Sequence, residues 1–183
     1  MNHDLRTLNR LFEVAIRHGL VADNPVRRVE RPQEEEPETD YFEAEELGEI
    51  LATVRARDPF RGDVVELLAT TGLRRAELVR LRTKDVNLRT DTLFVVGKRR
   101  SESIPLAPDA VEILKRLIHR ARGMARDEIV TLAELRQTFR VARSWVGDDR
   151  LHPHAMRHTY ATTLVRSGAP LHVVQRLMRV RTV

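Results

Sequence analysis

The chain has 183 residues, no cysteine and a net charge of +5, and 42% of its residues are hydrophobic but only 4% aromatic. This length allows one domain with a sizeable core, or one domain and a fragment of another, while the lack of cysteine excludes disulfide bonds and thiolate metal sites. The sequence shows no secretory leader and no run of about 18 apolar residues, so we expect a soluble, cytoplasmic protein outside membranes.

The first segment predicts a lone amphipathic helix. Residues 5–16 place apolar side chains at helical spacing, and the pattern breaks at Gly19. One helix cannot bury its own apolar stripe, so it either packs on the rest of the chain or ends a truncated domain, 1–30. Residues 31–40 are rich in charge and proline, which predicts a linker before a larger domain over 41–183.

The larger domain is predicted to be mainly helical with one small sheet. Helical periodicity, bounded by proline, glycine and other turn formers, covers residues 43–56, 61–72, 74–82, 108–122, 132–147, 153–168 and 170–178. The period changes to that of a hairpin over 86–96, and 102–106 could add a third strand. With so few aromatic residues, the core must consist of leucine, valine, isoleucine and alanine. We expect an α+β fold, mainly α with a three-stranded antiparallel sheet.

Charge is distributed unevenly along the chain. Residues 33–66 hold 12 acidic and 3 basic residues, a net charge of −9, whereas 67–183 hold 23 basic and 11 acidic residues, a net charge of +12. The basic part therefore indicates a polyanion partner such as nucleic acid. An arginine-rich, solvated helical surface would give the same balance.

Arg74 is the first candidate for binding an anion. Gly72 permits a sharp turn between two predicted helices, and Arg74 lies at the start of the second. A guanidinium group offers parallel N–H donors that fit two phosphate oxygens, and it keeps its charge at physiological pH. Glu77, one turn further on, could orient it. An ordinary surface arginine is the competing interpretation.

A second cluster follows in HPHAMRHT, where His154, Arg157 and His158 share one helix surface. Histidine can exchange a proton near neutral pH while a neighbouring arginine holds an anion. His154 and His158 also have the spacing of a helical zinc pair, with His152 nearby. Arg157 between them would repel a cation, so we expect no metal here. A histidine that simply packs at the start of a helix remains the alternative.

Lys98 is the third candidate. The chain contains 29 arginines but only three lysines, and this one follows VVG at the tip of the predicted hairpin. Lysine can release a proton, which arginine cannot do, so its use here indicates proton transfer. A basic turn that contacts a DNA backbone is the alternative.

Together these elements resemble the tyrosine recombinases, also called phage integrases. The marks are TGLRRAE at 71–77, GK at 97–98 followed by PL at 105–106, and HAMRH at 154–158, each in the expected order on helix, hairpin and helix. VVQRLM resembles the helix that follows the HAMRH motif, and RHGLVADNP resembles the end of the DNA-clamping domain that precedes the catalytic one. The resemblance covers nearly the whole chain.

The resemblance implies a role for each matching residue. Arg74 and Arg157 would hold the non-bridging oxygens of the scissile phosphate and stabilise its pentavalent transition state. Lys98 would protonate the departing 5′-oxygen, and His154 would assist proton movement at the attacking hydroxyl. In this family a tyrosine makes the attack, and the phosphotyrosyl bond allows rejoining without a metal, ATP or other cofactor.

The remaining site residues would support this centre. Glu77 would hold Arg74, and His158 would buttress the helix that carries the second box. Arg75, Arg99 and Arg100 are expected to bind DNA through its backbone. The expected partners are double-stranded DNA and other recombinase protomers on it.

The sequence departs from the family pattern near its end. After the VVQ helix the family shows a glycine and then a histidine or tryptophan, where this chain has Arg179 and Val180, so one phosphate hydrogen bond is expected to be missing. The nucleophilic tyrosine would follow about nine residues on, beyond Val183. Tyr41 falls in the linker region and Tyr160 at a position for a core aromatic, so neither is expected to attack.

We therefore expect a recombinase catalytic domain, truncated at both ends, that binds DNA but does not cleave it alone. The alternatives are a DNA-binding regulator without chemistry and a metal-dependent phosphodiesterase that uses His152, His154 and His158.

Overall fold

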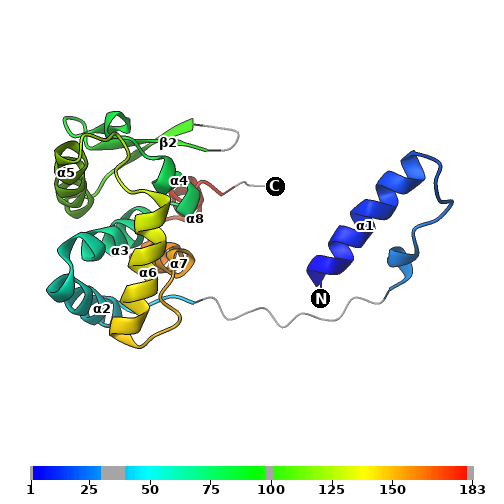
Figure 1. The fold of residues 1–183 in the computed structure, drawn as a ribbon, viewed down its shortest axis with the longest axis horizontal. Coiled ribbons are helices and arrows are strands. Elements are labelled where there is room, and N and C mark those ends of the chain that lie inside the picture. The colour runs from blue at the N-terminus through cyan, green and yellow to red at the C-terminus, as the bar shows by residue number, and fades with distance from the viewer. Residues whose placement is uncertain (1, 30–39, 98–100, 181–183) are drawn as a thin grey trace. The chain divides into compact units, whose positions relative to one another are not determined.

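The computed structural model of the chain describes residues 2–29, 40–97 and 101–180. These residues belong to two compact units, Met1–Glu38 and Thr39–Val183 (Figure 1). Within the described ranges, no helix is long and apolar enough to cross a membrane.

The first unit is one helix with a tail folded back on it. It contains α1 (Asn2–Arg17) and a 3-10 turn, η1 (Pro25–Arg28). The buried Asn24 caps η1 and also donates from Nδ2 to Asn9 Oδ1 at 2.9 Å and to Glu13 Oε1 at 3.1 Å. This amide holds the segment around Asn24 against α1. The helix ends at Arg17, close to the break predicted at Gly19.

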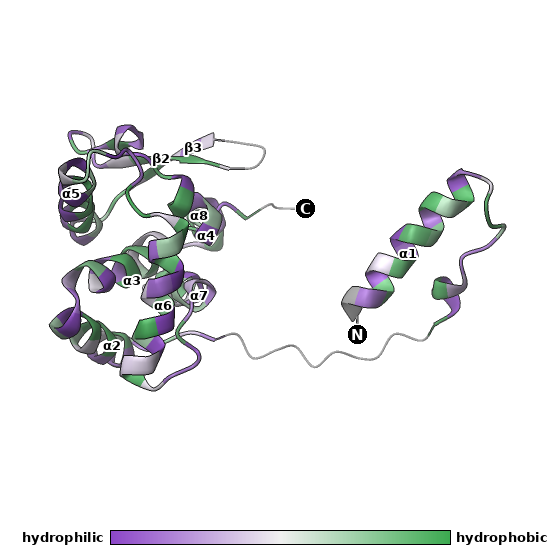
Figure 2. Cartoon of the chain, viewed as in Figure 1, coloured by the Kyte–Doolittle hydropathy of each residue, from purple (hydrophilic) through white to green (hydrophobic). Residues whose placement is uncertain are grey.

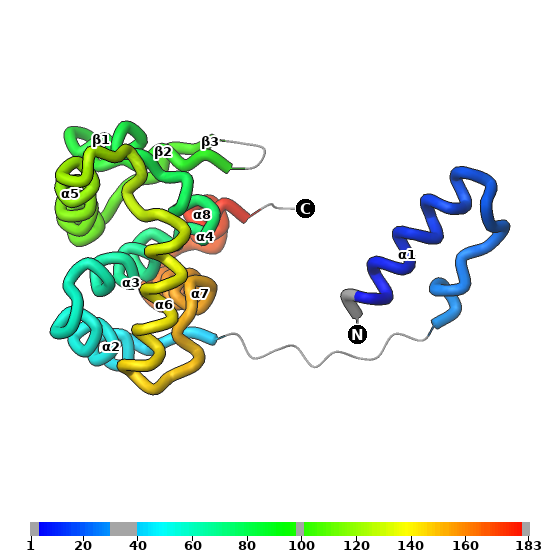
Figure 3. Tube along the Cα trace, viewed as in Figure 1, coloured from blue at the N-terminus to red at the C-terminus, as the bar shows by residue number. Residues whose placement is uncertain are grey.

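The second unit is a helical domain with a small sheet, as Figures 1 and 3 show. The elements are α2 (Ala44–Arg57), α3 (Pro59–Thr71), α4 (Arg75–Arg80), η2 (Thr83–Asp85), β1 (Val86–Asn87), β2 (Thr92–Val96), β3 (Ser101–Pro105), α5 (Pro108–Gly123), α6 (Leu132–Val146), α7 (Pro153–Arg166) and α8 (Leu171–Leu177). The strands form an antiparallel sheet in the order β1-β2-β3. The predicted fold class is therefore confirmed.

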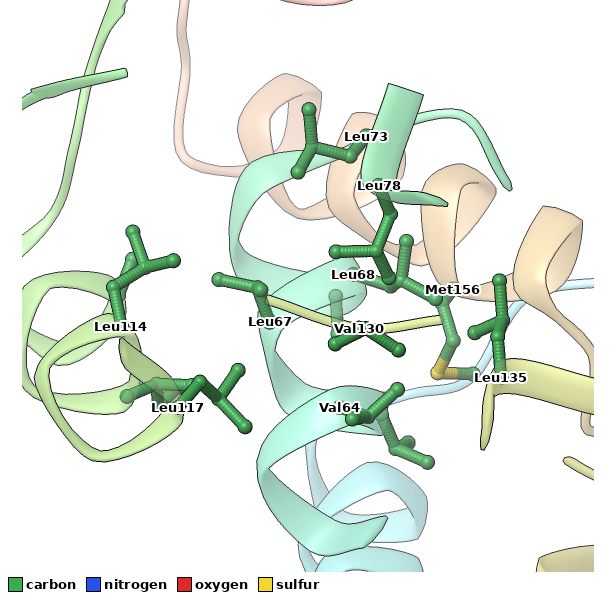
Figure 4. Packing of buried hydrophobic residues seen from close by; sticks show 14 of the residues in the cluster. Val64, Leu67, Leu68, Leu73, Leu78, Leu114, Leu117, Val130, Leu135 and Met156 are labelled. Atoms are coloured by element: carbon green, nitrogen blue, oxygen red, sulfur yellow. The ribbon is translucent and has the colours of Figure 1, made fainter. Parts of the chain in front are cut away.

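Helix α3 lies at the centre of this domain. It contacts α2, α5, α6 and α7, and Figure 4 shows its Val64, Leu67 and Leu68 among buried side chains from α5, α6 and α7. These three residues are fully buried. Most helices carry apolar and hydrophilic residues together in Figure 2, which is expected when each helix buries only one face. A well-buried central helix gives the residues at its C-terminal end a fixed position.

The sheet is shorter at one edge than the sequence predicts. In β2, Leu93 and Val95 are buried while Phe94 and Val96 are exposed, so the alternation that predicted the hairpin is present. Strand β1, however, has only two residues. The predicted helix over 74–82 ends at Arg80, because Arg82 instead forms an antiparallel bridge with Glu128.

Candidate active site

The candidate site is built on the corner between α3 and α4. Gly72 ends α3 in the left-handed conformation, with φ of +58°, and its carbonyl oxygen faces the site. Arg74 then caps the N-terminus of α4. Its Nη1 donates to Glu77 Oε1 at 2.8 Å, and its main-chain N–H donates to Glu77 Oε2 at 2.8 Å. Glu77 therefore holds both the side chain and the main chain of Arg74, while the guanidinium group remains exposed on its outer side.

Arg157 reaches the same corner from α7. Its Nη1 donates to the Gly72 carbonyl and its Nη2 to the Met178 carbonyl, so the side chain joins the end of α3 to the end of α8. Arg157 is only 5% exposed. Burial, together with the positive charges of Arg74 and Arg179, lowers its pKa to about 10. The group remains a cation at neutral pH, but this charge is costly to hold in the folded protein.

A third arginine, which the sequence did not predict as a site residue, completes the cluster. Arg179 Nη2 donates to Glu77 Oε2 at 2.8 Å and to the Gly72 carbonyl at 2.9 Å, and its Nη1 donates to the Leu177 carbonyl at 2.7 Å. Its own carbonyl accepts from Arg74 Nη2 at 2.9 Å. Three guanidinium groups thus surround the Gly72 corner.

Glu77 is the carboxylate that this cluster shares. Burial alone would raise its pKa, but hydrogen bonds from Arg179 and from the Arg74 main chain outweigh burial and lower it. Glu77 is therefore ionised at neutral pH. Its single negative charge faces the positive charges of Arg74, Arg157 and Arg179, which leaves an excess of positive charge suited to an anion.

The histidines of the second predicted cluster begin α7. His152 caps this helix, since its Nδ1 accepts from the Ala155 N–H at 3.0 Å, and its Nε2 lies 3.1 Å from Asp40 Oδ2. His154 and His158 lie edge to face, with ring centroids 4.3 Å apart. Burial and neighbouring positive charges, among them Arg157, lower the pKa of both rings below 6.5. The exposed His154 is therefore neutral near pH 7 and able to accept a proton.

These two pKa shifts predict that the protein loses stability in mild acid. A histidine whose pKa is lowered by folding binds protons more readily in the unfolded chain, so stability falls as pH drops through about 6.5 towards the folded value. We expect the free energy of unfolding, measured with urea, to decrease between pH 7.5 and pH 5. His154→Asn should flatten this dependence, whereas replacement of the exposed His119 of α5 by asparagine should leave it steep. A profile that His154→Asn leaves unaltered would contradict the prediction.

Comparison of the sequence with known protein families identifies the family of this chain. Residues 40–179 match the model described as the phage integrase family. The chain belongs to this family. Tyrosine recombinase XerD of Pseudomonas aeruginosa is 33% identical over 192 residues, covering 95% of this chain and 64% of that protein. A tyrosine recombinase of Thermosipho africanus is 29% identical, covering 95% and 65%. The chain thus spans less than two thirds of the length of these relatives.

Solved integrase structures share the fold. The Tn1549 transposon integrase in complex with circular intermediate DNA aligns with a TM-score of 0.82 at 20% identity, covering all of this chain and 71% of that chain. A lambda integrase dimer bound to a COC′ core site aligns with a TM-score of 0.72 at 20% identity, covering 97% and 55%. The chain therefore has the fold of these integrase structures.

Three of the predicted site residues, Lys98, Arg99 and Arg100, lie outside the described residues. Arg75, predicted to bind DNA, is exposed in the first turn of α4. Val180 is 52% exposed, and its side chain has no hydrogen-bond donor to offer. The structure thus brings together Arg74, Glu77 and Arg157.

The metal-dependent interpretation gains no support from the geometry. Over the described ranges, no group of three or more histidine, aspartate or glutamate side chains is arranged to hold a metal ion. His152 is engaged with Ala155 and Asp40, while Arg157 places a positive charge beside His154 and His158.

Proposed function

We propose that this chain provides the phosphate-binding part of a site-specific recombinase of the tyrosine type, which acts on double-stranded DNA. The observation that carries the proposal is the meeting of Arg74 and Arg157 at the Gly72 carbonyl corner, from two elements far apart in sequence. Guanidinium groups gathered at one corner supply the positive charge and N–H donors that the non-bridging oxygens of a phosphodiester need. The similar XerD and integrase proteins are recombinases or integrases, and several of the solved structures contain DNA.

Within this proposal each group has a distinct task. Arg74 and Arg157 bind the phosphate and stabilise the charge of its transition state. His154, neutral near pH 7 and on the same helix as Arg157, moves the proton of the attacking hydroxyl. Lys98 protonates the leaving 5′-oxygen. His158 packs against the His154 ring and so fixes its orientation.

The domain assignment is part of the same proposal. Residues 41–183 form the recombinase catalytic domain, 31–40 a linker, and 1–30 the terminal helix of a core-binding domain. The exposed Leu8 and Leu11 of α1 support this, because a lone helix leaves its apolar stripe uncovered within its own unit. A DNA substrate also fits the cytoplasmic location expected from the sequence.

The attacking tyrosine has to come from outside residues 1–183. The chain holds two tyrosines. Tyr160 lies against Gly72, and burial raises its pKa above 10, which makes a poor nucleophile. The ring of Tyr41 is covered by the guanidinium group of Arg166, whose Cζ lies 5.5 Å from the ring centroid. We propose that these residues bind DNA without cleaving it, and that a continuation of the chain or another protomer supplies the tyrosine.

DNA binding tests the first part of the proposal. We expect affinity for duplex DNA to fall steeply with salt, because most contacts are to phosphate. Arg74→Ala should weaken binding about tenfold and reduce the salt slope by roughly 1. Arg122→Ala is the matched control, since it removes one exposed charge in the last turn of α5, a helix that Figure 1 shows apart from α4 and α8. Equal losses in the two variants would contradict a dedicated phosphate site.

Covalent chemistry tests the second part. Incubation of residues 1–183 with a nicked suicide substrate is expected to give no protein–DNA adduct on a denaturing gel. An adduct that survives denaturation would overturn the assignment of Tyr41 and Tyr160 as non-nucleophilic. Affinity that falls with Arg74→Ala, together with the absence of an adduct, would support phosphate binding without cleavage.

A further inference from the structure

Arg179 occupies a position where its side chain is unexpected. It follows α8 with φ of +51°, in the left-handed region that favours glycine and costs other residues roughly 1 kcal/mol. The family pattern has a glycine here, which would bring no side chain. In this chain the turn instead directs a guanidinium group into the Gly72 corner, where its side chain is only 7% exposed.

The contacts of this side chain tie three elements to one another. Its Nη2 bonds to Glu77 in α4 and to the carbonyl of Gly72 at the end of α3, while its Nη1 bonds to Leu177 in α8. Arg74 closes the ring by donating to the Arg179 carbonyl. Arg179 therefore helps to set the position of Glu77, and through Glu77 that of Arg74.

The charges in this ring do not balance. Arg157 and Arg179 donate to the same Gly72 carbonyl, so two guanidinium groups lie side by side. Among the described residues, Arg179 Nε is also buried without a hydrogen-bond partner. Like charges at close range in a partly dry site repel each other. An anion held beside Arg74 and Arg157 would relieve this repulsion.

We propose that Arg179 is a third arginine of the phosphate site. It is a positioning residue that holds Glu77 and Arg74 in place, and its guanidinium group adds positive charge to the site that binds the DNA phosphodiester. This inference rests on the proposed function, because the anion is the phosphate that Arg74 and Arg157 hold. Arg179 thereby takes over part of the anion binding that Val180 cannot provide.

Thermal unfolding in sodium phosphate, with sodium chloride at matched ionic strength as reference, tests this role. Inorganic phosphate is expected to raise the unfolding temperature of the wild-type chain, and the concentration dependence gives an apparent dissociation constant. Arg179→Gly and Arg179→Gln should raise that constant about tenfold, because they remove charge and the hold on Glu77. Arg179→Lys, which keeps the charge, should recover part of the affinity. The glycine variant suits the left-handed backbone, so its fold is expected to persist.

Each outcome distinguishes this inference from the proposed function. Phosphate could stabilise the wild type and the Arg179 variants alike, while Arg74→Ala removes the effect. Arg179 would then only link elements of the fold, and the inference fails. If Arg179→Gly binds phosphate more tightly, then Arg179 obstructs the site and the inference fails. A wild-type chain that phosphate does not stabilise would overturn the phosphate site itself, and this inference with it.

Discussion

Arg157→Met is expected to weaken phosphate binding about 10- to 150-fold while it changes the free energy of unfolding by less than about 2 kcal/mol. Methionine is comparably long and unbranched, so it can occupy the buried space between α3 and α8. It offers no donor and no charge. Without Arg157, the phosphate would lose one of its charged partners, and with it roughly 1.5–3 kcal/mol of binding.

Stability should change little because two effects oppose each other. The pKa of Arg157 is lowered to about 10, which corresponds to a cost of roughly 3 kcal/mol for keeping the charge in the folded state. Methionine removes that cost, but the Met178 carbonyl loses its bond from Arg157, as does the Gly72 carbonyl. Gly72 still accepts from Arg179, so the loss is limited. On the proposed function, the buried charge of Arg157 serves phosphate binding rather than stability.

Urea unfolding and phosphate titration of the same samples check both halves of this prediction. Leu117→Ala is the contrasting variant, because Leu117 is fully buried in α5, and Figure 4 shows it apart from Leu73, the neighbour of Gly72. It should cost about 2–5 kcal/mol of stability and leave the phosphate affinity of the folded protein unchanged. Should Arg157→Met instead destabilise the protein as much as Leu117→Ala does, Arg157 would be a structural residue first.

Most of the fold was predictable because the local patterns and the packing agree. The break at Gly72, where φ is positive, and the alternation in β2 reflect backbone preferences that each segment carries by itself. The differences arise where a distant partner decides. Helix α4 stops at Arg80 because Arg82 bridges Glu128, which lies beyond α5 in the sequence. Periodicity in one segment contains no information about such a partner.

The site was predictable in part, for a similar reason. Sequence boxes located Arg74, Glu77 and Arg157, because each lies at a fixed offset from a turn or a helix start. Arg179 was interpreted only as a missing glycine. Its positive φ turns the side chain towards the Gly72 carbonyl, and this direction depends on how α8 packs against α7. The available signal was an arginine at a position where the family has glycine. From the sequence alone, it indicated the loss of a family residue rather than the gain of another arginine at the site.

Gly72→Ala is expected to cost about 2–5 kcal/mol of stability and to weaken phosphate binding as well. An alanine at φ of +58° is strained by roughly 1–2 kcal/mol. Its Cβ would also overlap the ring of Tyr160 and lie 3.2 Å from Met178 Sδ, so the half-buried ring has to move at a further cost of about 1–3 kcal/mol.

Gly147→Ala separates these two costs. Gly147 ends α6 with φ of +76°, but a Cβ there meets nothing within 4 Å, so its loss should be that of backbone strain alone. The excess for Gly72→Ala should shrink when Tyr160→Ser makes room in a double variant. Urea unfolding of the wild type, Gly72→Ala, Tyr160→Ser and the double variant would measure this. Phosphate affinity should fall only for the Gly72 variants, because the Gly72 carbonyl fixes both Arg157 and Arg179. Equal losses in Gly72→Ala and Gly147→Ala would mean that Tyr160 yields freely and that the corner is not held by packing. Gly72 would then serve only to form the turn. Its contacts indicate more, because Tyr160 and Met178 pack beside it and its carbonyl accepts from Arg157 and Arg179. Gly72 thus positions the core of the domain and the arginines of the site together.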